Sequence, residues 1–198
     1  MTNKILRYII LFILFPWPCQ AGPGGGDDRI PLELLDSIIT GTPDHEARFR
    51  EERRLQLLAQ PIRLAGTLRF VAPDRIEKHT AAPREDLVVV GAWASVRLHD
   101  RNTDTRLRIS DDPVLQALID TLRAILNGEP RRLAVYYEIE ARGSAGAWTL
   151  RLKPLGEALA DRIQAVEVAG ANNWMRRIAV RETTGDVTII DVTAGPGG

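Results

Sequence analysis

Few residues of this sequence have both the type and the spacing that catalysis or metal binding requires. The chain holds three histidines, His45, His79 and His99, and none has a second ligand two to four residues further along. Zinc sites are usually built from such closely spaced ligands, so the sequence predicts no metal site and no cofactor. There is no Gly-x-Ser-x-Gly elbow and no glycine-rich phosphate loop, and no serine has a neighbouring base. We therefore predict that the protein is not an enzyme.

Two clusters of carboxylates are the remaining candidates for acid–base chemistry. Asp111 and Asp112 stand before a proline and an apolar stretch, which is typical of a helix cap. Glu51 and Glu52 stand among arginines, which is typical of a solvated charged face. The alternative interpretation is that the fold brings two of these carboxylates together as a catalytic acid–base pair.

The charge balance argues against nucleic acid as a partner. The 198 residues include 26 basic and 26 acidic ones, so the net charge is zero and no global field attracts a polyanion. The three arginine doublets are interleaved with acidic residues and form no basic stripe. Trp93, Trp148 and Trp174 could rim a pocket, but their places in the pattern favour core packing or anchoring at strand ends.

The first 21 residues have the plan of a secretory signal peptide. Lys4 and Arg7 precede an apolar run that ends before Pro16, and small residues follow. The run is about half of the ~20 residues that a membrane-spanning helix needs. We expect cleavage after Ala21 and a soluble protein of the periplasm, and the alternative is lipid attachment at Cys19.

The rest of the chain is predicted to form a single domain over residues 30–193. The glycine-rich residues 22–29 precede it as a flexible leader, and residues 194–198 follow it as a flexible tail. We find no internal repeat and no long linker between these ends.

Alternation of apolar and polar residues dominates the predicted domain. We expect an amphipathic helix over residues 31–41, a second helix that turns into a first strand at 49–58, and a third helix from Asp111 or Asp112 to Asn127 and Gly128. Strands are predicted at 62–71 and 75–80, in a hairpin over 85–100 around Gly91, at 102–110, 131–143, 146–154 and 161–170, and in a final hairpin over 173–193. These are about ten strands with two or three helices, and their short connections favour an antiparallel meander.

The order of several short motifs along the chain identifies a similar family. Residues 49–91 read FREERRLQLLAQPIRLAGTLRFVAPDRIEKHTAAPREDLVVVG. Their matching positions are Phe49, Gly66, Leu68, Phe70, Pro73, Ile76 and Pro83, followed later by Leu150, Pro154 and the hairpin glycine Gly185. This order resembles that of the periplasmic outer-membrane lipoprotein carriers, the LolA-like family, over most of the expected mature chain.

The resemblance implies a mainly β (α+β) fold, an incomplete antiparallel β-barrel covered by two or three helices. Between sheet and helices, such a protein shields the acyl chains of a lipoprotein or lipid during transport toward the outer membrane. The implied partners are those acyl chains, an inner-membrane donor protein and an outer-membrane acceptor protein, and we expect a monomer.

The implied lipid-binding residues lie on the apolar faces of the predicted elements. They are Leu64, Leu68, Phe70 and Ile76 on the strands and Val114, Leu118 and Leu122 on the helix. The similar carriers have an arginine directly before the proline that closes this strand, where this chain has Ala72. That arginine is implied to hold the helical lid, and Arg75 is a possible replacement at the rim. The difference favours a paralogue that serves another lipid or another export system.

The residues alone leave two alternatives to a carrier. The first is a non-catalytic periplasmic binding or scaffold module whose sheet and helix form a closed core, and the apolar stripe from Val114 to Leu126 fits it equally well. The second is an exported hydrolase, for which no nucleophile or metal motif is present in the sequence.

Overall fold

Eleven antiparallel strands form one sheet in the computed structural model of the chain, which describes residues 29–41 and 45–195. The strands are β1 (His45–Arg54), β2 (Ile62–Val71), β3 (Arg75–Thr80), β4 (Glu85–Val90), β5 (Trp93–Leu98), β6 (Thr103–Arg108), β7 (Tyr137–Ser144), β8 (Ala147–Pro154), β9 (Ile163–Ala171), β10 (Trp174–Glu182) and β11 (Val187–Ala194). Their order across the sheet is β6-β5-β4-β3-β2-β1-β11-β10-β9-β8-β7. Because β6 and β7 stand at opposite edges, the sheet is open, which confirms the expected incomplete antiparallel barrel.

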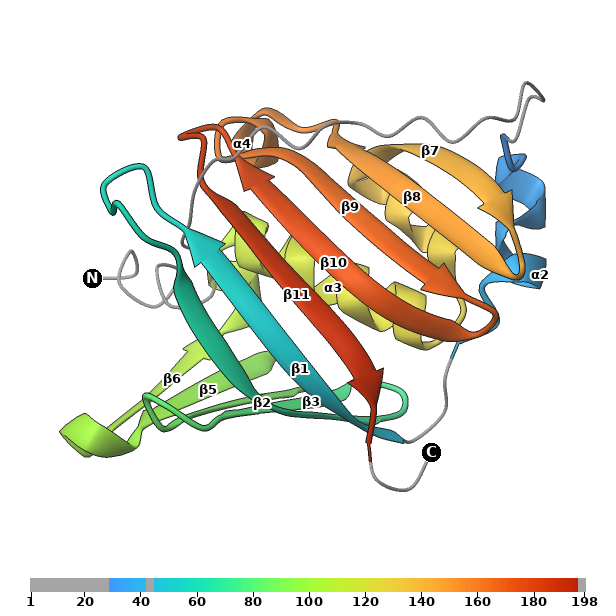
Figure 1. Cartoon of the computed structure of the whole chain (residues 1–198). Helices are drawn as coiled ribbons and strands as arrows, with labels where there is room; N and C mark the ends of the chain where they lie inside the picture. Colours follow the sequence, from blue (N-terminus) through green and yellow to red (C-terminus); the bar gives the residue numbers. More distant parts are fainter. Residues whose placement is uncertain (1–28, 42–44, 196–198) are drawn as a thin grey trace.

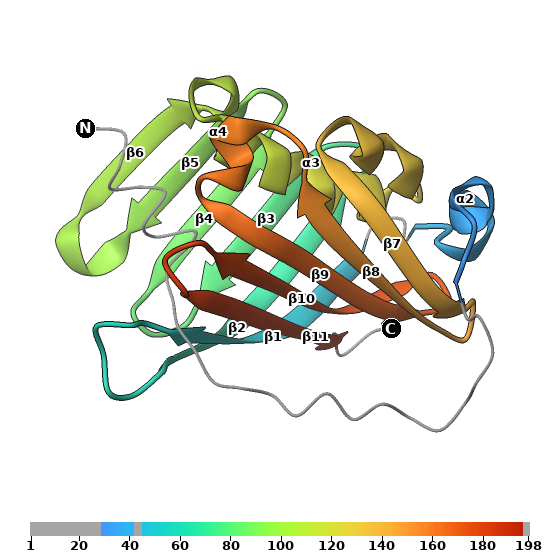
Figure 2. The same cartoon turned by 90° about the horizontal axis from the view of Figure 1, so that it is seen from above.

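One long helix lies on the concave side of this curled sheet. The helical segments are the 3₁₀ helices η1 (Leu32–Leu34), η2 (His99–Arg101), η3 (Ile109–Asp111) and η4 (Pro130–Val135) and the α-helices α2 (Leu35–Ile38), α3 (Pro113–Leu126) and α4 (Glu157–Ala160). Figure 1 shows α3 behind the strands, and Figure 2 shows it between the β3–β4 part and the β7–β9 part of the sheet. The chain therefore passes from one edge strand to the other through the helix that covers the concave face.

Alternation along each strand decides which residues face α3. On β8, Trp148, Leu150 and Leu152 are buried while the residues between them are exposed. Successive side chains of a strand point to opposite faces, so this pattern leaves the convex face to solvent and gives the concave face an apolar surface.

Helix α3 forms where the sequence predicted it, because its two ends carry strong local signals. The Asp112 carboxylate accepts hydrogen bonds from the backbone N–H groups of Val114 (2.9 Å) and Leu115 (3.1 Å), and Pro113 occupies the first turn. Gly128 follows the helix with a φ of +74°, a left-handed conformation that favours glycine.

Two predicted elements differ from the observed ones. Residues 45–54 form a strand from His45 onward, where we expected a helix leading into a strand at 49–58. The charges of this segment suit a helix surface, but every second residue from Ala47 to Arg53 is buried on the inner face of β1. The expected strand over 131–143 starts only at Tyr137, because residues 130–135 form η4.

The ends of the expected domain lie at the limits of the described residues. The expected signal peptide, residues 1–21, lies outside them, as does most of the leader. Arg29 forms a β-bridge with Arg142, the N–H of Ile30 donates to the carbonyl oxygen of Ala141 (2.9 Å), and β11 extends to Ala194. Within the described ranges, no helix is both long enough and apolar enough to cross a membrane.

Candidate functional site

A cavity of about 130 Å³ lies between α3 and the concave face of the sheet. The helix contributes Leu118, Ile119, Leu122 and Leu126 to its lining, and the sheet contributes His45, Ala47, Leu68, Arg69, Phe70, Ile76, Lys78, Glu85, Leu87, Val89, Val96, Trp174, Met175, Ile178, Ile190 and Val192. Most of these side chains are apolar, so the cavity offers an apolar surrounding to an apolar part of a ligand.

The structure brings five of the seven predicted lipid-binding residues to this cavity. They are Leu68, Phe70 and Ile76 on the sheet and Leu118 and Leu122 on the helix. That these residues bind lipid remains a prediction.

The other two predicted lipid-binding residues and the possible rim residue Arg75 lie elsewhere. Val114 is fully buried in the core and does not line the cavity. Leu64 is half-buried, pairs with Glu51 of β1 and does not line the cavity. Arg75 projects from the opposite face of β3, where its guanidinium donates a hydrogen bond to Glu77 (2.6 Å).

The residues that β1 and β10 add to the cavity were not among the predicted site residues, although Trp174 was considered for the rim of a pocket. The rings of His45 and Trp174 meet edge to face, with centroids 5.0 Å apart, and Phe70 lies 6.1 Å from His45. These side chains form an aromatic end of the cavity. The alternation of β10 was a signal for Trp174, but the pairing order that places β10 near β2 is not visible in the sequence.

The opposite part of the lining carries charges. Lys78 forms an ion pair with the carboxylate of Glu51, which also accepts a hydrogen bond from Arg53. The Lys78 ammonium also lies 4.9 Å from the centroid of the Phe49 ring. The interpretation of Glu51 as part of a solvated face is therefore wrong, since its residue exposure is 2%.

The pKa values of two carboxyl groups at this end respond differently to burial. Burial raises the pKa of Glu51, but the charges of Lys78 and Arg53 and their hydrogen bonds outweigh it and lower the pKa below its ordinary value. Burial also raises the pKa of Glu85, and here the same two cations do not outweigh it. Among the described residues, the charged end thus holds one carboxyl group with ion-pair partners, Glu51, and one without, Glu85.

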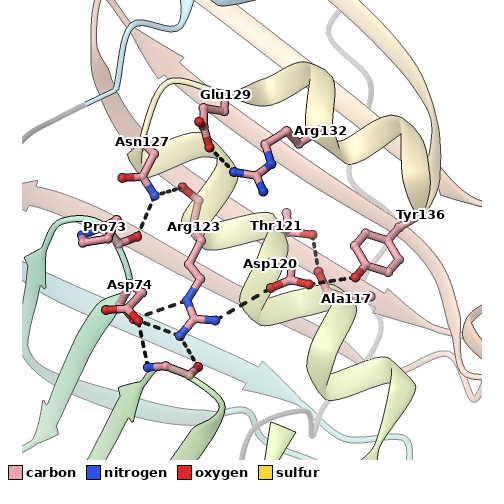
Figure 3. A network of polar contacts seen from close by, with 11 residues as sticks. Pro73, Asp74, Ala117, Asp120, Thr121, Arg123, Asn127, Glu129, Arg132 and Tyr136 are labelled. Atoms are coloured by element: carbon pink, nitrogen blue, oxygen red, sulfur yellow. Dashed lines mark hydrogen bonds and ion pairs between the residues drawn. The ribbon is translucent and has the colours of Figure 1, made fainter. Parts of the chain in front are cut away.

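Polar contacts tie the C-terminal half of α3 to two turns of the sheet (Figure 3). The Arg123 guanidinium donates to the backbone carbonyl oxygens of Asp74 (2.9 Å) and Gly91 (2.7 Å). Asn127 donates to the carbonyl oxygen of Pro73 (2.8 Å). The Asp74 carboxylate accepts from the N–H of Gly91 (3.0 Å), which joins the β2–β3 and β4–β5 turns to each other.

These contacts bear on the missing family arginine. The resemblance implies an arginine at the position of Ala72, directly after β2. In this structure an arginine contact is made at the same turn by Arg123, which reaches from the helix to the Asp74 carbonyl. At the other end of α3, Arg162 forms an ion pair with the capping residue Asp112 (3.2 Å).

The histidines His79 and His99 meet on the convex face rather than in the cavity. The Nδ1 of His79 lies 2.9 Å from one Asp86 oxygen, and the Nε2 of His99 lies 2.6 Å from the other. Among the described residues, no cluster of three or more histidine, cysteine or acidic side chains is arranged to hold a metal ion.

The chain is similar to a described protein family and to solved structures. The chain matches the family described as "Outer membrane lipoprotein carrier protein LolA-like" over residues 34–195. A crystal structure of a LolA superfamily protein from Nitrosomonas europaea is similar at 12% identity and a TM-score of 0.43, with 82% of this chain and 89% of that chain covered. A DUF1329 family protein from Desulfovibrio piger is similar at 9% identity and a TM-score of 0.43, with 84% of this chain and 91% of that chain covered. No curated protein matches the sequence.

Proposed function

Because the chain belongs to the outer membrane lipoprotein carrier protein LolA-like family, we propose that it is a carrier that shields the acyl chains of a lipoprotein or lipid. The chains lie between the concave face of the sheet and α3 while the cargo moves through the periplasm toward the outer membrane. An inner-membrane donor protein loads the carrier, an outer-membrane acceptor protein receives the cargo, and the carrier acts as a monomer. Binding and release account for this function, so the proposal assigns no catalytic step to the protein.

The observation that carries the proposal is the apolar cavity lined by both sheet and helix. Exposing an acyl chain to water costs ~0.8 kcal/mol for each CH₂ group. Side chains such as Leu68, Phe70 and Leu122 offer that chain an apolar surrounding. A carrier of acyl chains needs such a space.

The size of the cavity implies that α3 moves when cargo binds. Its volume of about 130 Å³ is close to that of the ~150 Å³ engineered apolar cavity that holds one benzene molecule. A long acyl chain needs several times this space, so α3 must move away from the strands. The hydrogen bonds of Arg123 and Asn127 to backbone carbonyls can be exchanged for hydrogen bonds to water, which makes such a movement reversible.

A binding experiment with a neutral fluorescent alkyl probe tests the carrier function. Leu122 lines the cavity from α3 and is half-buried, so Leu122→Glu places a carboxylate among apolar groups without removing a fully buried core residue. We expect this variant to fold, by circular dichroism, and to lose probe binding by tenfold or more, on the order of the cost of burying one uncompensated polar group.

The matched control is Val90→Glu. Val90 is 40% exposed, lies on the convex side of β4 and does not line the cavity, so this variant should bind the probe like the wild type. Mass spectrometry of lipid extracted from the wild-type protein, purified from its native host, should reveal acyl chains. Equal binding by both variants, or a protein that carries no lipid, would favour the closed-core scaffold.

A further inference from the structure

The cavity has one feature that shielding of an acyl chain does not require. Glu85 and Lys78 both line it, as do Arg69 and His45, although most of the lining side chains are apolar. Glu85 pairs with Thr80 of β3, and Thr80 is buried on the inner face of the sheet. The carboxyl group of Glu85 therefore lies on the concave face, at the charged end of the cavity.

Glu85 is the unbalanced charge at this end. Unlike Glu51, which is paired with Lys78 and Arg53, it forms no hydrogen bond or ion pair with any residue that the structure describes. The charged groups that act on it most strongly are two cations, Lys78 and Arg53, and two anions, Glu51 and Asp86. The charges of these four groups sum to zero, so they leave the negative charge of Glu85 unbalanced.

A half-buried carboxyl group without a partner is costly beside an apolar cavity. Burial disfavours its charged form, and nothing among the described residues donates a hydrogen bond to it. A ligand that brings a cation to this point removes both costs, since an N⁺–H donor forms a charge-assisted hydrogen bond and balances the charge.

We propose that Glu85 binds the ammonium head group of an amphiphile whose alkyl chain occupies the apolar cavity. A carboxylate or phosphate head group would instead add a second negative charge in a place of low dielectric, where like charges repel strongly. This inference rests on the proposed carrier function, because it assigns a head-group class to the ligand whose chain fills the same space. Under this proposal the cargo is a lipid, or another acylated molecule, that carries an amino group.

Three amphiphiles of equal chain length test this assignment: a primary alkylamine, a fatty alcohol and a fatty acid. Each competes with a neutral fluorescent alkyl probe for the wild-type protein at a mildly alkaline pH, where the amine is a cation and the acid an anion. We expect the amine to bind about tenfold or more tighter than the acid, with the alcohol between them, since one charge-assisted hydrogen bond accounts for a difference of this size.

Variants of Glu85 show whether this residue causes the preference. Glu85→Gln keeps the shape and one acceptor oxygen, but it replaces the other oxygen with an NH₂ donor and removes the charge. The amine should therefore lose its advantage over the alcohol to within about twofold. Glu138→Gln is the control, because Glu138 is exposed on β7, where it pairs with Lys153, and it does not line the cavity. That variant should keep the wild-type order.

The outcomes separate this inference from the carrier function. Binding of all three amphiphiles without preference, a preference for the fatty acid, or an unchanged amine preference in Glu85→Gln overturns the inference alone. Absence of binding by any alkyl chain overturns the carrier function as well. If Glu85→Gln does not fold, the order of affinities for the wild-type protein still tests the inference. Tightest binding of the amine supports it, and equal binding or tightest binding of the acid overturns it.

Discussion

Glu51 is a buried carboxylate that holds two cations on the inner face of the sheet. Its side chain is 1% exposed, and those of Lys78 and Arg53 are 11% and 10% exposed. Buried ion pairs contribute little net stability when intact, because both charges lose their hydration. Removing one partner is different, since the remaining charges stay buried without compensation.

Glu51→Gln should therefore be strongly destabilising. Breaking a buried pair costs ~3–5 kcal/mol, and we expect the lower end of this range because Glu85 remains as a nearby anion. The measurement is the free energy of unfolding in urea. Asp104→Asn removes the partner of Arg97 in an exposed pair and should cost less than ~1 kcal/mol. Similar losses in the two variants would contradict the buried network.

Glu182 at the end of β10 gives the protein a pH-dependent stability. One of its carboxyl oxygens is buried without a hydrogen-bond partner among the described residues. Burial, followed by the charge of Asp186, raises the pKa of Glu182 to about 8, against the opposing charge of Arg162. The folded protein thus keeps this proton where an unfolded glutamate, with its ordinary pKa of 4.5, has lost it.

The sign of the effect follows from proton linkage. Between pH 4.5 and about 8 the folded state binds one proton more than the unfolded state at this residue, so stability falls as the pH rises through this interval. Glu182→Gln should remove this residue's contribution to the loss of stability with rising pH. The free energy of unfolding of the variant, relative to that of the wild type, should therefore increase until about pH 8. Urea unfolding at several pH values measures it, and a constant difference between the two proteins would count against the raised pKa.

At the scale of elements, α3 is held to the sheet by two different kinds of interaction. Its apolar stripe packs on the concave face, and Arg123 and the C-cap residue Asn127 donate hydrogen bonds to backbone carbonyls at the turns. Apolar packing does not depend on direction, whereas each hydrogen bond fixes a position. The hydrogen bonds therefore fix the position of the C-terminal end of α3 relative to the sheet.

Arg123→Ala should loosen this end of α3. The variant loses hydrogen bonds to the carbonyls of Asp74 and Gly91, for which we expect a stability loss of ~1–3 kcal/mol. The C-terminal half of α3 should exchange its amide hydrogens faster, and the neutral alkyl probe should bind faster, since opening precedes entry.

Arg132→Ala is the control for this change. Arg132 is exposed in η4, close in sequence to α3, and pairs with Glu129 instead of the sheet. Its hydrogen exchange and probe uptake should match those of the wild type. Unchanged exchange in Arg123→Ala would mean that apolar packing alone holds the helix.

At the scale of the whole molecule, the pairing of β1 with β11 joins two halves of the sheet. One half runs from β2 to β6 and the other from β7 to β10, and each is a series of strands connected by short turns. Register between β1 and β11 extends from Ala47 with Ala194 to Arg54 with Val187. This long-range pairing places the aromatic side chains of β1, β2 and β10 around one end of the cavity.

The sequence by itself determined the parts of this protein that depend on neighbouring residues. Helix α3 was predictable because its cap, its first-turn proline and its final glycine all lie within the helix and its ends. Most strands were predictable from alternation, and the order of short motifs identified the family.

Only the tertiary structure decided what depends on distant residues. Glu51 looked solvated because its cation Lys78 lies 27 residues away on another strand, and a charge can be buried only where such a partner arrives. Arg123 gave no signal because its acceptors are carbonyls 49 and 32 residues away. Leu64 and Leu68 share one face of β2, yet only Leu68 lines the cavity. Alternation fixes the face on which a side chain lies, whereas the path of α3 across the sheet decides which part of that face encloses a space.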